Sequence, residues 1–282
     1  MSEKITQSRI VADLRDNLGV RDGDQIAVHS SLKAVGLVEG GPATLIAALI
    51  EAVGGVERGT VLMPCFVKPA DVIDLNNTPT WVGLVAETFR TWPGVHLSRN
   101  HTHRVAIVGR DAETIAACHV GTSPLGAGSP FHELAKRGGA VLHIGCNFCS
   151  SSIIHVAEHL FPLPFNEQQI TWPDYNRNIT LVCEDGSRIV CPPIDNPGDS
   201  GGFLPLQDYM DRFGLIRHGQ VGQAHAMRVR GLDMLAMAFD LLRRDPAALL
   251  CHQPGCPVCP PKRAIAEAWM KSHPVSASLP VI

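Results

Sequence analysis

Residues 141–159, with the sequence VLHIGCNFCSSSIIHVAEH, constrain the fold more than any other stretch of the chain. The stretch opens with an apolar run that ends at Gly145, continues through a polar cluster, and then shows helical spacing from Ser151 or Ser152. This order predicts a buried strand, a tight turn and a helix that either serine can cap. Because such a unit places side chains and free N–H groups beside a small ligand, the sequence predicts a ligand site here.

Segments on both sides of this unit alternate between helix and strand patterns, which is typical of an α/β fold. Residues 69–79 have the composition of a loop, whereas residues 169–193 alternate in the β manner around the hairpin signal Asp185-Gly186. We therefore expect a mixed central sheet flanked by helices, with an antiparallel β excursion at about 169–193. The expected helices cover about 5–18, 42–53, 81–92, 111–119, 129–138, 151–159, 204–213 and 231–244, and the expected strands cover 25–29, 59–64, 105–108 and 141–144.

The length of 282 residues is sufficient for one full hydrophobic core. The chain has no internal repeat, no low-complexity segment and no clear linker. We expect a single α/β domain over residues 1–250. A Cys/His-rich C-terminal extension with a helix at about 261–271 is expected over residues 251–282.

Charge and hydropathy exclude several classes of function. The net charge of −3, without a basic stripe, argues against nucleic acid as a partner and is compatible with a small cationic amine as substrate. No run approaches 18 consecutive apolar residues, so no membrane partner is expected, and the first residues do not form a signal peptide. Nine cysteines without a secretion signal suggest thiols or metal ligands in a cytoplasmic protein. The sequence does not indicate the oligomeric state.

His155 and Glu158 are the first candidate catalytic residues. They are three positions apart on the expected helix and therefore share one of its faces. A histidine oriented by a carboxylate is the usual composition of a general base. The alternative is a surface helix that carries ordinary polar residues, and spacing alone does not separate the two interpretations.

The same helix also fits a signature of another class. His155, Glu158 and His159 match H-x-x-E-H, in which two histidines bind zinc and the glutamate acts as base. A zinc metallohydrolase is therefore the alternative function. It requires a third metal ligand downstream, which the spacing does not identify.

Two further motifs lie at turns. His29 ends a strand and Ser30 and Ser31 follow it, where hydroxyl groups and free N–H groups can hold a phosphate, a pantetheine group or an oxyanion. On this motif alone, a simple turn is the favoured interpretation. Cys146 and Cys149 have C-x-x-C spacing, but no thioredoxin-like pattern surrounds them, so small residues that fill a tight turn are the favoured interpretation. The chain has no G-x-S-x-G, Walker A or G-x-G-x-x-G motif.

Four soft metal ligands occur within nine residues near the C-terminus, between prolines: Cys251, His252, Cys256 and Cys259. Thiolates and imidazole suit tetrahedral zinc, and four protein ligands close a site to water. We therefore expect one structural zinc ion here. The alternative is a cysteine-rich tail without a metal.

Six runs in order carry a resemblance that is more specific than any single motif: VHSSLKAVGLVEGGPATLIAALIEAVGGVERGTVLMPCF, SRNHTHRVAIVGRDAETIAACH, SPFHEL, VLHIG, IIHVAEH and GQVGQAHAMRVRGLDML. This order, over about residues 5–250, resembles the aminoglycoside 3-N-acetyltransferases, the antibiotic acetyltransferase family. The chain differs from the family pattern at His101-Thr102, where the family often has proline after the histidine, and in its cysteine-rich tail.

The resemblance implies transfer of an acetyl group from acetyl-CoA to an amine of an aminoglycoside or a similar aminocyclitol. It places the catalytic histidine at His155 and its carboxylate at Glu158. Coenzyme A is implied to bind at residues 29–32, which are His29, Ser30, Ser31 and Leu32. Direct transfer within a ternary complex is expected, and a biosynthetic amine that is not an antibiotic is the alternative acceptor.

Overall fold

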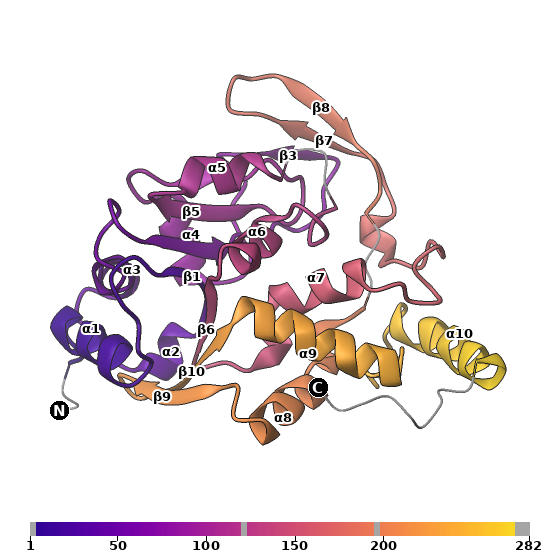
Figure 1. Cartoon of the computed structure of the whole chain (residues 1–282). Helices are drawn as coiled ribbons and strands as arrows, with labels where there is room; N and C mark the ends of the chain where they lie inside the picture. The colour runs from indigo at the N-terminus through magenta and orange to yellow at the C-terminus, as the bar shows by residue number, and fades with distance from the viewer. Residues whose placement is uncertain (1–3, 120–122, 195–197, 274–282) are drawn as a thin grey trace.

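The computed structural model describes residues 4–119, 123–194 and 198–273 and is built around one large sheet (Figure 1). The strands of this sheet are β1 (Gln25–Ser30), β2 (Thr60–Pro64), β4 (His96–Leu97), β5 (Val105–Gly109), β6 (Ala140–Ile144), β9 (Arg217–Val221) and β10 (Ala224–Arg230). The seven strands have the order β4-β5-β2-β1-β6-β10-β9. Strand β1 is parallel to β2 and β6, and the other neighbours are antiparallel. The expected mixed central sheet is confirmed.

Helices cover both faces of this sheet. The α-helices of the described residues are α1 (Gln7–Asp16), α2 (Leu32–Val35), α3 (Pro42–Ala52), α4 (Leu84–Arg90), α5 (Ala112–Ala117), α6 (Pro130–Lys136), α7 (Ser152–Leu160), α8 (Leu204–Arg212), α9 (Gly231–Arg244) and α10 (Cys259–Ser272), of which α10 lies away from the sheet. Side chains alternate along each strand. Val141 of β6 belongs to the hydrophobic cluster that includes residues of α5, α6, α7 and α9, whereas Leu142 and Ile144 belong to the cluster that includes residues of α1, α3 and α4. The sheet therefore separates two hydrophobic layers.

The connection between β6 and α7 has the order that the sequence predicts. All residues of β6 are buried, and the chain turns at Gly145, whose φ of +68° favours glycine. A Cβ atom at this position would lie 2.3 Å from the Cβ of Ala34, so the turn also packs too closely for a side chain. Ser151 is the N-cap residue of α7, although its hydroxyl makes no capping hydrogen bond.

A second, smaller sheet forms the antiparallel excursion and lies at the top of the view in Figure 1. Strands β7 (Ile179–Val182) and β8 (Arg188–Cys191) form the expected hairpin. The third strand, β3 (Val72–Asp74), pairs in parallel with β7. This strand lies inside residues 69–79, which the sequence analysis expected to form a loop. The sequence did not indicate the strand because three residues are too few to show a strand periodicity. Residues 170–172 belong to the segment 169–193 that was expected to alternate in the β manner, but they do not form a strand.

Arg104, immediately before β5, links the two sheets. Its side chain is fully buried, and its guanidinium donates hydrogen bonds to the backbone carbonyl oxygens of Cys65, Leu75 and Thr78. Leu75 and Thr78 follow β3 directly. A buried cation thus satisfies the carbonyl groups of the turn that joins the small sheet to the body.

The C-terminal part differs in detail from expectation. Helix α10 begins at Cys259, before the expected residue 261, because the prolines that follow lie in its first turn, where a missing N–H costs nothing. Ala266 of α10 packs in the same hydrophobic layer as α7 and α9. Residues 274–282 of the expected extension lie outside the described residues, and the division of the chain at residue 250 stays a prediction.

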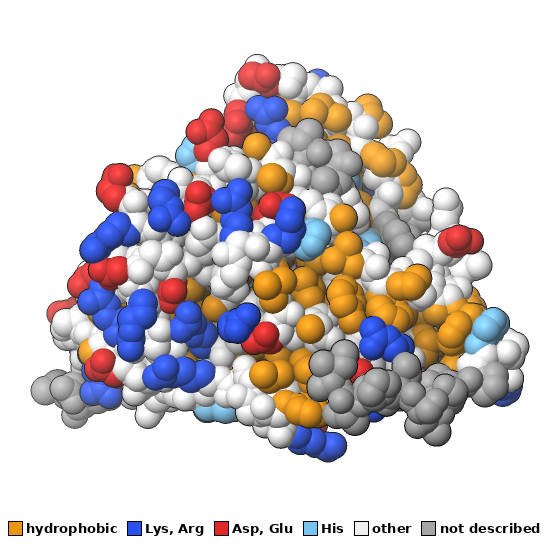
Figure 2. Space-filling view, in the orientation of Figure 1, with side chains coloured by type: hydrophobic (Ala, Val, Ile, Leu, Met, Phe, Trp, Pro, Cys, Tyr) orange, Lys and Arg blue, Asp and Glu red, His pale blue; other side chains and the backbone are white. Residues whose placement is uncertain are grey.

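The surface shown in Figure 2 is divided by residue type. Lys and Arg side chains, interspersed with Asp and Glu, gather over the side of the molecule that carries α1 and α3, whereas hydrophobic side chains gather around α9.

In the described part of the chain, no helix has the length and apolar character needed to cross a membrane.

Candidate active site

A cavity of about 880 Å³ brings together two of the segments that the sequence analysis selected. The end of β1 contributes His29 and Ser30 to its wall, Ser31 and Leu32 follow at the start of α2, and α7 contributes His155. The two segments meet because β1 and β6 are parallel neighbours, so the chain leaves both strands at the same edge of the sheet.

His155 and Glu158 form a hydrogen-bonded pair in this wall. The distance from His155 Nδ1 to Glu158 Oε2 is 2.7 Å, and the side chains are 13% and 1% exposed, respectively. Because the carboxylate accepts the proton on Nδ1, Nε2 is the nitrogen that can take up another proton. A histidine held by a carboxylate in this way can act as a general base.

Residues from a distant part of the chain support this pair. The ring of Phe203 contacts the His155 ring edge-on, with the centroids 4.7 Å apart. A Cβ atom on Gly198 would lie 2.8 Å from Glu158 Oε1, so a side chain at this position would displace the carboxylate. Neither residue was selected from the sequence, because its role depends on a contact between segments and not on a local motif.

His29 is buried at the base of the cavity. Burial lowers the pKa of this histidine to about 4, so the ring is neutral at pH 7. The backbone N–H of Ser152 lies 3.5 Å from its Nε2 and donates to it, and the Cys146 thiol donates to its carbonyl oxygen over 3.4 Å. The Ser31 hydroxyl caps α2 by accepting from the N–H of Ala34. The neutral ring therefore joins the first strand to the N-terminus of α7.

His103 also lines the cavity and was missed in the sequence. Its ring lies 4.5 Å from the ring of Phe66, and the Thr102 hydroxyl is 2.9 Å from its Nδ1. Burial, with smaller effects from His155 and other nearby histidines, lowers the pKa of His103 to about 3. No motif distinguishes this residue among the thirteen histidines of the chain.

The C-x-x-C residues lie in the cavity wall as free thiols. Burial raises the pKa of Cys146 to about 11, which disfavours the thiolate that redox chemistry needs. This supports the interpretation of Cys146 and Cys149 as small residues that fill a tight turn.

The metallohydrolase alternative gains no support. The His159 ring is near the Ser123 hydroxyl, at 3.4 Å from Nε2, and burial lowers the pKa of His159 to about 4. Across residues 4–119, 123–194 and 198–273, a single group of three or more His, Cys, Asp or Glu side chains has its ligand atoms close enough to share a metal ion. That group does not include His155 or His159.

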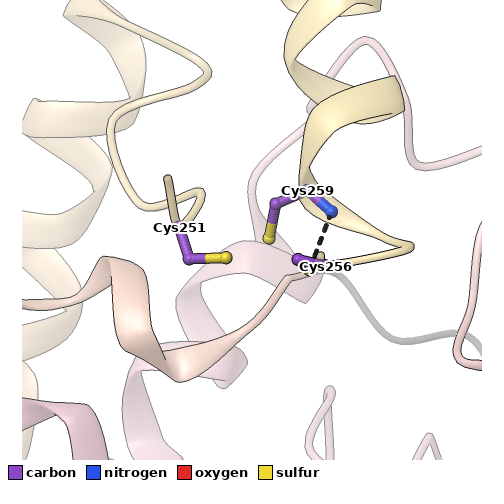
Figure 3. Close-up of side chains that lie close together, drawn as sticks. All are labelled: Cys251, Cys256 and Cys259. Atoms are coloured by element: carbon purple, nitrogen blue, oxygen red, sulfur yellow. Dashed lines mark hydrogen bonds between the residues drawn. The ribbon is translucent and has the colours of Figure 1, made fainter. Parts of the chain in front are cut away.

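The group consists of three cysteines of the predicted zinc site (Figure 3). The sulfur atoms of Cys251, Cys256 and Cys259 lie within 4.8 Å of one another, and all three residues are buried. His252 is outside the group. Its exposed ring has Nε2 3.4 Å from the guanidinium of Arg263.

Comparison of the sequence with known proteins gives a consistent result. Residues 27–243 match the family described as aminoglycoside 3-N-acetyltransferase. The chain is 31% identical over 242 residues to aminoglycoside N(3)-acetyltransferase IV from a Salmonella species, with 84% of this chain and 87% of that protein covered. It is 33% identical over 271 residues to aminoglycoside N(3)-acetyltransferase III from Serratia marcescens, with 85% and 97% covered.

Solved structures agree with the sequence comparison. The apoenzyme of aminoglycoside acetyltransferase AAC(3)-IVa superposes with a TM-score of 0.79 at 29% identity, covering 95% of this chain and 98% of that one. A histidine-to-alanine mutant of the same enzyme, in complex with gentamicin, gives 0.80 at 29% identity, covering 94% and 98%. A binary complex of AAC-IIIb with CoASH gives 0.74 at 25% identity, covering 86% and 97%.

Proposed function

The chain belongs to the aminoglycoside 3-N-acetyltransferase family, and from this premise we propose that it transfers the acetyl group of acetyl-CoA to an amine of an aminoglycoside or a similar aminocyclitol. The observation that carries the proposal is that His155 and residues 29–32 line the same cavity. Among the structural neighbours, one is a complex with CoASH and another a complex with gentamicin, which supports both substrates.

In the proposed mechanism, His155 is the general base. Its Nε2 takes a proton from the acceptor nitrogen as that nitrogen attacks the carbonyl carbon of the thioester. The new C–N bond forms, the C–S bond breaks, and the coenzyme A thiolate leaves. The proton that His155 took up passes to this thiolate, which returns His155 to its neutral form. Transfer is direct within a ternary complex, and no acyl-enzyme is formed.

Glu158 is the positioning residue for this base. Its carboxylate is almost completely buried and accepts from His155 Nδ1, so it holds the imidazole in one tautomer. The same carboxylate stabilises the imidazolium that forms during transfer, because opposite charges interact strongly where water is excluded.

Residues 29–32 are the proposed contact for coenzyme A. Ser30 and Ser31 offer hydroxyl groups at the cavity wall, and Leu32 begins the short helix α2. Lys33 follows in the same wall and provides a positive charge suited to the phosphates of the coenzyme.

The wall also favours a second candidate acceptor. Among the cavity-lining residues in the described ranges, Lys33 is the one formally charged side chain, and Phe66 and Trp81 add aromatic surface. An acceptor with several ammonium groups is best held by carboxylates. A less cationic biosynthetic amine is therefore the second candidate, with the same chemistry.

Release of the coenzyme A thiol, measured across a panel of aminoglycosides and simpler amines, tests the function and identifies the acceptor class. His155→Ala should lower kcat by about 10²–10⁴-fold, the scale for loss of a general base. Isothermal titration should show unchanged acetyl-CoA binding. His96→Ala, on the edge strand β4, is the matched control and should retain activity. Near-full activity of His155→Ala would remove this residue from the mechanism, and absence of acetyl-CoA binding would refute the proposed function.

A further inference from the structure

The cysteine cluster lies outside the cavity, and we propose that it is a structural zinc site in which Cys251, Cys256 and Cys259 bind the ion as thiolates. The three sulfur atoms come from two segments: Cys251 lies in the middle of the connection between α9 and α10, and Cys256 and Cys259 lie at the turn that begins α10. In Figure 3 the side chains of these segments converge on a common space. None of the three cysteines lines the cavity, so the ion takes no part in transfer.

The spacing of the sulfur atoms suits zinc. All pairs are within 4.8 Å, and tetrahedral thiolates at about 2.3 Å from zinc lie about 3.8 Å apart. The cysteines are free thiols, so no disulfide occupies the cluster. Small side-chain movements toward the common centre are sufficient to bind the ion, and each bound thiol releases one proton.

Backbone N–H groups already point at two of the sulfur atoms. The N–H of Asp199 donates to Cys259 Sγ over 3.2 Å, and the N–H of Cys259 donates to Cys256 Sγ over 3.3 Å. Donors of this kind stabilise the negative charge of metal-bound thiolates and orient them. The cluster therefore has an outer layer of hydrogen bonds, which a chance grouping of buried thiols does not require.

His252 is the proposed fourth ligand. It follows Cys251 directly, its ring is exposed, and its one described polar contact is the 3.4 Å approach to the Arg263 guanidinium. Rotation of this side chain brings a ring nitrogen to the ion and closes the site to water, as in structural zinc sites with three cysteines and one histidine. Zinc with three thiolates has a net charge of −1, which the neighbouring Arg263 offsets.

The ion would fasten three parts of the chain. Arg263 of α10 donates to the carbonyl oxygen of Leu250 over 2.6 Å. A Cβ atom on Gly202 would lie 2.2 Å from the carbonyl oxygen of Leu249, so the loop that contains Asp199 packs directly on the segment before Cys251. Zinc would hold α10, this segment and the loop together.

Metal content of the wild-type chain, purified reduced and without chelator, is the first test. Elemental analysis should find about one zinc per chain. Exchange for Co²⁺ should give the charge-transfer absorption of thiolate-bound cobalt and the visible bands of a tetrahedral ion. Removal of zinc with a chelator should increase proteolytic cleavage near α10.

Variants then assign the ligands. Cys256→Ser and Cys259→Ser should lose the zinc, whereas the control Cys118→Ser, at the C-cap of α5 and outside the cluster, should keep it. His252→Ala should keep the thiolate–Co²⁺ absorption but release zinc at a lower chelator concentration. This exposed substitution and the wild-type measurement remain informative if a cysteine variant does not fold.

Three results would overturn the proposal. One is a wild-type chain that contains no zinc and gives no thiolate–Co²⁺ absorption when cobalt is added. Another is a Cys256→Ser or Cys259→Ser variant that retains zinc as the wild type does. The third is a count of fewer than nine free thiols in the denatured, unreduced protein, which would indicate a disulfide in place of a metal site. Each readout is independent of acetyl transfer.

Discussion

The buried ring of His143 should make the free energy of unfolding depend on pH. This residue is the next-to-last of β6 and is fully buried, and in the described part of the chain neither ring nitrogen has a hydrogen-bond partner. Its ring stacks on that of His29 at 5.3 Å and lies 5.1 Å from that of Phe148. Burial, and secondarily His29, holds the pKa of His143 well below its ordinary value of 6.5.

The direction of the effect follows from proton binding. Below pH 6.5 the unfolded chain takes up a proton at His143, whereas the folded chain does not until the pH reaches its much lower pKa. The free energy of unfolding therefore falls as the pH falls through this window. At pH 5 the loss from this single histidine is about 2 kcal/mol, because each unit below the unfolded pKa contributes about 1.4 kcal/mol.

His143→Phe removes this titration and keeps an aromatic ring between His29 and Phe148. Urea unfolding followed by circular dichroism should find the variant about 2 kcal/mol more stable, relative to wild type, at pH 5 than at pH 7.5. The packing cost of the larger ring cancels, because it is present at both pH values. Val141→Ala, a neighbouring buried position without a titrating group, should have the same cost at both. An equal difference between His143→Phe and wild type at both pH values would show that His143 is not kept neutral by the fold.

Three substitutions test other parts of the structure. Glu158→Gln should lower kcat by on the order of 10²-fold with acetyl-CoA affinity unchanged, because His155 loses its orienting charge. Steady-state kinetics measures this effect, and an unchanged kcat would contradict the prediction. Arg104→Met should reduce the free energy of unfolding by about 3 kcal/mol or more, because buried carbonyl groups lose charged donors, and urea unfolding measures this loss. Gly145→Ala should cost about 2–3 kcal/mol by the same assay, since its positive φ and the contact with Ala34 leave no room for a side chain.

The parts of the fold and site that local spacing determines could be predicted from the sequence. The β6–α7 unit is one, because an apolar run, a glycine and a helical pattern follow one another directly. The hydrogen bond between His155 and Glu158 is another, since residues three apart on a helix are neighbours. The meeting of His29 with α7 was implied by the family resemblance and not by the local pattern.

The parts of the fold and site that depend on contacts between distant segments could not be predicted from the sequence. Strand β3 exists because β7 pairs with it, and Phe203 reaches His155 only when the chain returns to α7. Strands β9 and β10 were also missed. The alternation in β10 is present, with Ala224 buried and His225 exposed, but small and polar residues gave it little hydrophobic contrast.

The pairing of β3 with β7 has a consequence for the order of folding. The two strands are short and lie far apart along the chain, so closing the long connection between them is entropically costly and few contacts offset that cost. We expect the small sheet to assemble after the central sheet has placed Arg104, whose guanidinium donates to the carbonyl oxygens of the turn that follows β3. In the native state the same sheet should open at a lower free energy than the body does. Fast amide hydrogen exchange there, with slow exchange in β1 and β6, would be the signature of a late-folding unit attached to an early one.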